Sequence, residues 1–233
     1  MFRKLKICVV VPSYQEEKHI GRVIKTMPHL VDHIVVVDDY STDKTSEKAL
    51  NVNDSRVILI RHNKNQGVGR SIVTGHREAI QLKADISVVM AGDAQMNPDY
   101  LVDLLSPIID ENYDYAKGSR FLNKDHRSNM PKIRIIGTVL LTFVTKVLSG
   151  YWNLTDSQNG YTAIRTKILR KIDLDNLSKG YQFENDMILA LSKLNAKIKD
   201  VAIPCIYEGN LSKIELRTFI PETLRFLFDC FIN

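Results

Sequence analysis

Two polar side chains, Asp93 and Gln95, come shortly after an apolar run at residues 86–90. The run is rich in β-branched residues, which predicts a buried strand, and Asn97-Pro98 then favours the start of a helix. Alternate residues of an extended segment point the same way, so we expect Asp93 and Gln95 to reach one point. Two oxygen ligands at the end of a buried strand suit a hard divalent cation that carries substrate phosphates. A surface Asp that caps the following helix explains this stretch alone equally well.

Similar groups of polar residues follow other predicted strands or open predicted helices, at residues 12–16, at Asp38-Asp39 and at residues 65–67. Right-handed crossovers would bring all of them to one edge of a parallel sheet, beside Asp93. Helix capping alone accounts for the hydroxyl and amide side chains in these groups. It accounts less well for two adjacent acids, because neighbouring carboxylates repel each other unless a positive group or a donor-rich ligand is near. The sequence therefore favours a ligand site at this edge.

Apolar runs and segments with helical apolar spacing alternate along the chain. Strands are predicted at residues 7–11, 34–37, 57–60, 86–90, 113–117, 161–164 and 198–203, and helices at residues 16–27, 41–50, 67–82, 100–109, 131–149 and 182–194. This alternation predicts an α/β fold with a mostly parallel central sheet and helices on both faces. We expect residues 1–215 to form one domain and residues 216–233 to form a basic, aromatic tail.

The composition bounds the classes of protein and partner. The chain has 233 residues, of which 44% are hydrophobic and 25% charged, as is ordinary for a globular protein with a full core. A net charge of +5 suits anionic substrates or an anionic membrane face and is not by itself evidence for nucleic acid. The three cysteines lie far apart without metal-binding spacing, which indicates a reducing compartment. No apolar run reaches 18 residues, so we predict no membrane-spanning helix.

The predicted helix at residues 131–149 is amphipathic. Its apolar residues fall on one side, namely Ile133, Ile136, Leu140, Phe143, Val144 and Val147. Two interpretations stay open: the helix lies on a membrane surface, or it packs by its apolar side on the protein core. For the tail at residues 216–231 we favour membrane contact over a solvated flank.

Seven motifs resemble those of the family 2 glycosyltransferases of the GT-A fold, and most closely the branch of dolichol-phosphate mannose and glucose synthases. They are VVVPSYQEE (residues 9–17), DDYSTDKT (38–45), NQGVGRSIVTG (65–75), AGDAQMNP (91–98), KGSRF (117–121), DSQNGYTAIR (156–165) and GYQFENDMIL (180–189). No single motif is strong, but seven in the same order are hard to attribute to chance. The chain departs from the family pattern at Ala91, where the first acid of DxD usually stands, at Tyr40 and Lys44, which replace glycines, and at Tyr207, where the lipid-phosphate branch often has Arg.

The resemblance implies roles for individual residues. The nucleotide would be bound by Pro12, Tyr14, Glu16, Asp38, Asp39, Gly67, Arg70 and Asp93, with Asp38 accepting a hydrogen bond from the base and Asp39 supporting the pocket. Asp93 and Gln95 would bind Mg²⁺ or Mn²⁺ across the diphosphate. Arg120, Arg134 and Lys213 would face the diphosphate or an acceptor phosphate.

The resemblance also implies a reaction, the inverting transfer of a hexose from a UDP- or GDP-sugar to a polyprenyl or dolichyl phosphate. We expect a peripheral protein on the cytoplasmic face of a membrane, in surface or protein glycosylation, with a slight preference for UDP. A lipid phosphate is already anionic and needs no strong base, whereas a glycan hydroxyl would need one, and Asp186 is then the candidate. A third alternative, a non-catalytic protein that binds nucleotide-sugars, is motivated by Ala91.

Overall fold

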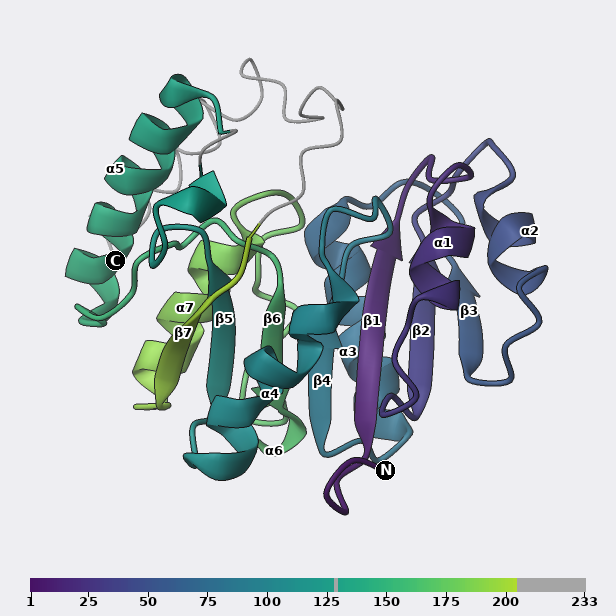
Figure 1. Ribbon diagram of the computed structural model, residues 1–233, viewed down its shortest axis with the longest axis horizontal. Helices are drawn as coiled ribbons and strands as arrows, with labels where there is room; N and C mark the ends of the chain where they lie inside the picture. Colours follow the sequence, from purple (N-terminus) through teal and green to yellow (C-terminus); the bar gives the residue numbers. More distant parts are fainter. Residues whose placement is uncertain (128–129, 205–233) are drawn as a thin grey trace.

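The computed structural model describes residues 1–127 and 130–204 (Figure 1). Its strands are β1 (Ile7–Ser13), β2 (His33–Asp38), β3 (Val57–Arg61), β4 (Ile86–Val89), β5 (Tyr115–Ser119), β6 (Thr162–Arg165) and β7 (Ile198–Ala202). In this part of the chain they form one sheet in the order β3-β2-β1-β4-β6-β5-β7. β6 runs antiparallel to both of its neighbours and the other pairs are parallel. The predicted α/β fold with a mostly parallel sheet is confirmed.

Helices cover both faces of the sheet, as predicted. They are α1 (Ile20–Lys25), α2 (Thr45–Leu50), α3 (Val68–Gln81), α4 (Leu101–Asp110), α5 (Lys132–Ser149), α6 (Thr166–Leu169) and α7 (Phe183–Lys193). Apolar side chains of α1 and α4 pack with one set of strand residues, and those of α3 and α7 pack with the alternate set on the other face. This alternation follows from the two-residue side-chain period of a strand.

The first two helices begin later than predicted, at Ile20 and Thr45. The residues before them form turns, and hydrogen bonds between these turns hold them out of the helices. The backbone N–H of Gln15 donates to Ser41 Oγ at 3.0 Å, and that of Glu16 donates to Thr45 Oγ1 at 2.8 Å. The polar residues that read as helix caps therefore join two loops to each other.

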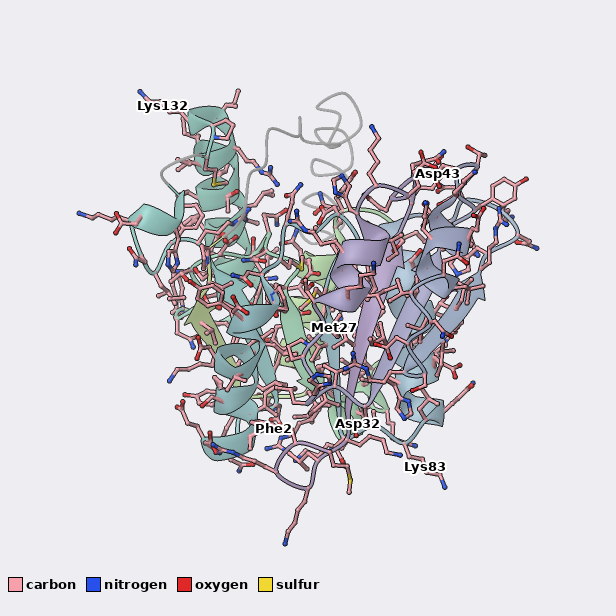
Figure 2. All side chains as sticks on the ribbon, turned by 45° about the vertical axis from the view of Figure 1, so that its right-hand side comes forward. Phe2, Met27, Asp32, Asp43, Lys83 and Lys132 are labelled. Atoms are coloured by element: carbon pink, nitrogen blue, oxygen red, sulfur yellow. The ribbon has the colours of Figure 1, made fainter. Side chains whose placement is uncertain are left out.

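The carboxyl ends of the parallel strands lie at one edge of the sheet, which we call the site edge. Ser13 stands opposite Asp38, and Asp38 stands opposite Arg61. Since β6 is antiparallel, the loop that precedes it reaches the same edge. Figure 2 shows Asp43, which follows β2, and Lys132, the first residue of α5, at this end of the molecule, with Phe2, Asp32 and Lys83 at the opposite end.

Helix α5 turns its apolar side outward. The residues it buries against the protein are mostly hydroxylated: Thr138, Leu141, Thr142, Thr145 and Ser149. The residues it exposes are large and apolar: Ile133, Ile136, Val139, Leu140, Phe143 and Val147. The alternative that this helix packs by its apolar side on the core is therefore wrong. No described helix is long and apolar enough to cross a membrane.

Candidate functional site

The loops after β1 and β2 form the first wall of the site. Pro12 lies in the buried strand β1. In the loop that follows, Glu16 is buried and Tyr14 is exposed. The side-chain amide of Gln15 donates to Thr42 Oγ1 at 2.8 Å, which adds to the backbone bonds between the two loops. The predicted nucleotide residues of the first motif thus lie on a loop that is fixed by its neighbour.

Asp38 is fully buried and already has protein donors. The Ser41 N–H donates to Oδ1 at 2.8 Å, the Ser46 hydroxyl donates to Oδ2, and Arg61 Nε lies 3.6 Å from Oδ2. These partners relieve the repulsion between the adjacent acids. A base could contact this carboxylate, as predicted, only if one of these partners moved, because Asp38 has no exposed surface here.

Asp39 organises the loop after β3. Its Oδ1 lies 2.7 Å from His62 Nδ1 and accepts from the Gln66 N–H at 2.9 Å, and its Oδ2 accepts from the Gly67 N–H at 2.8 Å. His62 Nε2 lies 3.0 Å from Thr74 Oγ1 in α3. Asp39 therefore fixes the residues that precede the N-terminus of α3. This geometry suits the predicted role of Asp39 as a support of the pocket. Sequence reasoning missed His62, because a lone His after a strand carries no signal.

Gly67 and Gly69 let another part of the backbone approach. Gly67 has a φ of 92°, and a Cβ there would lie 2.4 Å from the Lys179 carbonyl oxygen. The Gly69 N–H donates to the same oxygen at 2.8 Å. Gly67 is predicted to bind the nucleotide, and the close backbone approach that its lack of a side chain allows is made here by the protein's own segment at residues 178–180.

Asp186 binds this segment, and Arg70 binds Asp175, which lies shortly before it in the chain. Arg70 Nη1 donates to Asp175 Oδ1 at 2.9 Å, and the Ser178 N–H donates to Asp186 Oδ2 at 2.8 Å. Burial raises the pKa of Asp186, and the hydrogen bond from Ser178 opposes that rise. Asp186 therefore fixes the segment beside α3, and Arg70 ties Asp175 to the same helix. The roles predicted for Arg70 and Asp186 in the reaction stay predictions.

Asp93 and Gln95 lie in a turn. The prediction that they belong to an extended segment is wrong, since β4 ends at Val89 and Ala94 has a φ of 60°. The Gln95 N–H donates to Asp93 Oδ1 at 3.0 Å, which closes the turn and leaves Oδ2 for other partners. Among the described residues, no three His, Cys, Asp or Glu side chains cluster as a metal site. One carboxylate and one amide fit a cation that takes its other ligands from phosphates and water.

Arg120 follows β5 at the site edge. Its Nε and Nη2 donate to the two oxygens of Asp156 at 2.7 and 2.9 Å, and both side chains are buried. This two-point pair fixes the plane of the guanidinium group. Arg134 lies in the first turn of α5. Lys132, the residue at which this helix begins, lies at the same end of the molecule as the site edge (Figure 2). Lys213, Tyr207 and the predicted tail lie outside the described residues.

Sequence reasoning missed a buried ion pair between Lys117 of β5 and Glu184 of α7. Lys117 Nζ donates to Glu184 Oε2 at 2.9 Å and also to the Asn159 carbonyl oxygen. The signal was a Lys at the end of a predicted strand in a sheet that helices cover on both faces, because a charge buried there needs a partner. The partner is 67 residues away in the sequence, so the pattern could not identify it.

The family profile described as "Glycosyl transferase family 2" matches residues 8–173. An uncharacterized protein of Methanocaldococcus jannaschii is 38% identical over 88% of this chain and 83% of its own. The UDP-N-acetylglucosamine–dolichyl-phosphate N-acetylglucosaminyltransferase of Methanococcus voltae is 34% identical over 86% of each chain. The undecaprenyl-phosphate mannosyltransferase of Micrococcus luteus is 30% identical over 85% of this chain and 83% of its own.

Solved structures with the same fold are more distant in sequence. Glucosyl-3-phosphoglycerate synthase from Mycobacterium tuberculosis in complex with UDP superposes with a TM-score of 0.74 at 20% identity, over 98% of this chain and 80% of that one. Its complex with Mn²⁺ and UDP-glucose gives a TM-score of 0.70, over 98% of this chain and 79% of that one. At this identity the likeness concerns the fold alone.

Proposed function

This chain belongs to glycosyl transferase family 2 and has the GT-A fold, and from that premise we propose that it transfers a hexose from a nucleotide-sugar to a polyprenyl or dolichyl phosphate at a membrane surface. The names of two relatives, at 34% and 30% identity, specify dolichyl phosphate and undecaprenyl phosphate as acceptors. Their alignments span most of both chains, which supports the same class of acceptor here. We place the protein on the cytoplasmic face, in a glycosylation pathway, with UDP preferred over GDP.

The observation that carries the lipid acceptor is the outward apolar side of α5. A helix on a globular protein ordinarily turns its apolar side to the core, and α5 does the reverse, with Leu141 as the one large apolar residue that it buries. Each large apolar side chain that enters the acyl boundary of a membrane stabilises the bound state by up to about 1.5–3 kcal/mol. Six such residues on one helix therefore supply enough free energy for reversible binding to a bilayer.

The polar machinery lies at the end of α5 where a headgroup would be. Arg134 is in the first turn of α5, and Lys132 at the start of this helix lies at the end of the molecule that carries the site edge (Figure 2). Arg120, held in plane by Asp156, follows β5 at the site edge. A lipid phosphate that arrives beside α5 would thus meet guanidinium groups, which bind phosphates well.

In the proposed reaction an oxygen of the lipid phosphate attacks the anomeric carbon from the side opposite the nucleotide. The bond from that carbon to the nucleotide diphosphate breaks, and the diphosphate leaves with the electron pair, so the configuration inverts. No proton has to be removed from the acceptor. Arg120, Arg134 and Lys213 would orient the two phosphate groups and balance their charge. Mg²⁺ or Mn²⁺, held by Asp93 and Gln95, would supply further positive charge at the diphosphate.

Two other functions compete. Transfer to a glycan hydroxyl would need a base, and the raised pKa of Asp186 favours that residue. A non-catalytic role in binding nucleotide-sugars is favoured by Ala91, which removes one acid from the usual pair.

One experiment separates the three functions. The purified protein is incubated with labelled UDP- and GDP-sugars, Mg²⁺ or Mn²⁺, and vesicles that carry a short polyprenyl phosphate. Label in the lipid extract supports our proposal. Label only in soluble glycans, lost in Asp186→Asn, supports the second function, and nucleotide binding without turnover supports the third.

A further inference from the structure

The carboxylate of Glu184 is held by one oxygen only. Its Oε2 accepts from Lys117 Nζ at 2.9 Å, and Tyr115 Oη lies 3.5 Å from the same oxygen. Within residues 1–127 and 130–204 no group donates to Oε1. The side chain is nevertheless only 11% exposed. A nearly buried carboxylate with one open oxygen is a fixed hydrogen-bond acceptor.

The open oxygen faces Gly160, beside the turn that holds Asp93. A Cβ on Gly160 would lie 3.7 Å from Glu184 Oε1 and 3.5 Å from the methyl group of Met96. Met96 belongs to that turn, because its Sδ accepts from the Ala91 N–H at 3.2 Å. Glu184 Oε1 therefore lies across Gly160 from the side chain of Met96, which directly follows Gln95 in the chain. Asp93 and Gln95 are the residues that we expect at the diphosphate. The hexose is bonded to that diphosphate.

A structural role alone does not explain this arrangement. Burying the ion pair of Lys117 and Glu184 costs more free energy than burying two apolar side chains of the same volume. The pair also leaves Glu184 Oε1 without a hydrogen-bond donor among the described residues. Asp186, the other acid in the first turn of α7, turns to Ser178. Two residues on a helix that are two positions apart point to nearly opposite sides, so Glu184 is the acid that α7 turns toward Gly160.

We propose that Glu184 determines donor specificity by accepting, through Oε1, a hydrogen bond from a hydroxyl of the transferred hexose. Lys117 positions the carboxylate and keeps its charge balanced. Gly160 leaves the oxygen uncovered, since any side chain there would stand between Glu184 and the sugar. The inference rests on the proposed function, because it requires a nucleotide-sugar at Asp93.

The test compares binding of a nucleotide-sugar with binding of the nucleotide alone. Gly160→Ala adds a methyl group at ordinary contact distances, so the protein should fold, but the methyl group covers Glu184 Oε1. The double variant Lys117→Met with Glu184→Met removes both charges at similar volume, which protects folding. Gly21→Ala in α1 is the control, since its nearest neighbour to a Cβ is Val52 at 4.0 Å.

Calorimetric titrations with UDP, UDP-glucose and UDP-N-acetylglucosamine, and with the GDP and GDP-mannose pair, give the affinities. We expect both variants to bind the preferred nucleotide-sugar about tenfold to a hundredfold more weakly than the parent, as for a hydrogen bond to a charged group. Binding of the free nucleotide should not change. A donor analogue that lacks the hydroxyl bound by Glu184 should bind the parent as weakly as the intact donor binds the variants. Its affinity should be the same for the parent and for the variants.

Three results would overturn the inference. Equal weakening of nucleotide and nucleotide-sugar would show a structural role, and unchanged binding of both would show that Oε1 has no ligand. In either case the parent still binds a nucleotide-sugar and the proposed function stands. If the parent binds no nucleotide-sugar at all, the proposed function and this inference fall together.

Discussion

Replacing Leu140 and Phe143 by Ser tests whether α5 meets a membrane. The two side chains are 62% and 57% exposed. Full burial of a large apolar side chain contributes about 1.5–3 kcal/mol, so burying the exposed part of each contributes about 1–2 kcal/mol to the free energy of membrane binding. The double variant should therefore bind vesicles about 30-fold to several hundred-fold more weakly than the parent. Cosedimentation with vesicles that contain anionic lipid measures the change.

Both positions face outward, so the free energy of unfolding should change by less than about 0.5 kcal/mol, as a urea titration will show. Leu50→Ser is the matched control, because Leu50 is 56% exposed on α2, away from the apolar side of α5. Membrane contact by α5 is refuted if the double variant sediments with vesicles like the parent. Equal loss in Leu50→Ser would refute it too, since it would show that any exposed Leu contributes.

Three further substitutions test the site. Asp93→Ala should abolish metal-dependent transfer, and full activity of that variant would refute the metal assignment. Asp156→Asn leaves the buried guanidinium of Arg120 without its charge partner, so the free energy of unfolding should fall by about 3–5 kcal/mol in a urea titration. The raised pKa of Asp186 means that the folded protein binds a proton more tightly there than the unfolded chain, so this group lowers stability as the pH rises from the unfolded to the folded pKa. Asp186→Asn, which keeps an acceptor for Ser178, should therefore be more stable than the parent at neutral pH, and the difference should vanish in acid, below both pKa values.

The sequence predicts the sheet and the position of Asp93 well, because both depend on short-range patterns. An apolar run ended by polar residues identifies a buried strand and its carboxyl end. The backbone conformation of the residues after the strand is harder to predict from the sequence. Ala94 takes a left-handed φ that Ala rarely adopts, and only the bond from Gln95 to Asp93 Oδ1 reveals why.

The sequence does not predict which residues far apart in the chain contact each other. A glycine at position 67 indicates a close backbone approach, but the pattern does not say whether a ligand or the segment at residues 178–180 makes it. The same limit applies to Arg120, whose partner Asp156 is 36 residues away. In each case the residue type indicates that a close neighbour or a charge partner is required, and only the fold shows which group provides it.

The orientation of α5 connects the membrane proposal with the site. A helix whose apolar side faces outward must satisfy its inner side by hydrogen bonds, and α5 does so with hydroxyls. Thr145 Oγ1 donates to Asn185 Oδ1 at 3.0 Å, and the Ser157 N–H donates to Thr142 Oγ1 at 3.0 Å. Asn185 is the residue after Glu184, and Ser157 follows the partner of Arg120. Because hydrogen bonds are directional, whereas apolar contacts allow a helix to slide or turn, these bonds fix α5 in register with the site. A lipid phosphate that enters along α5 would therefore arrive at one constant place relative to the bound sugar, which an in-line displacement at the anomeric carbon requires.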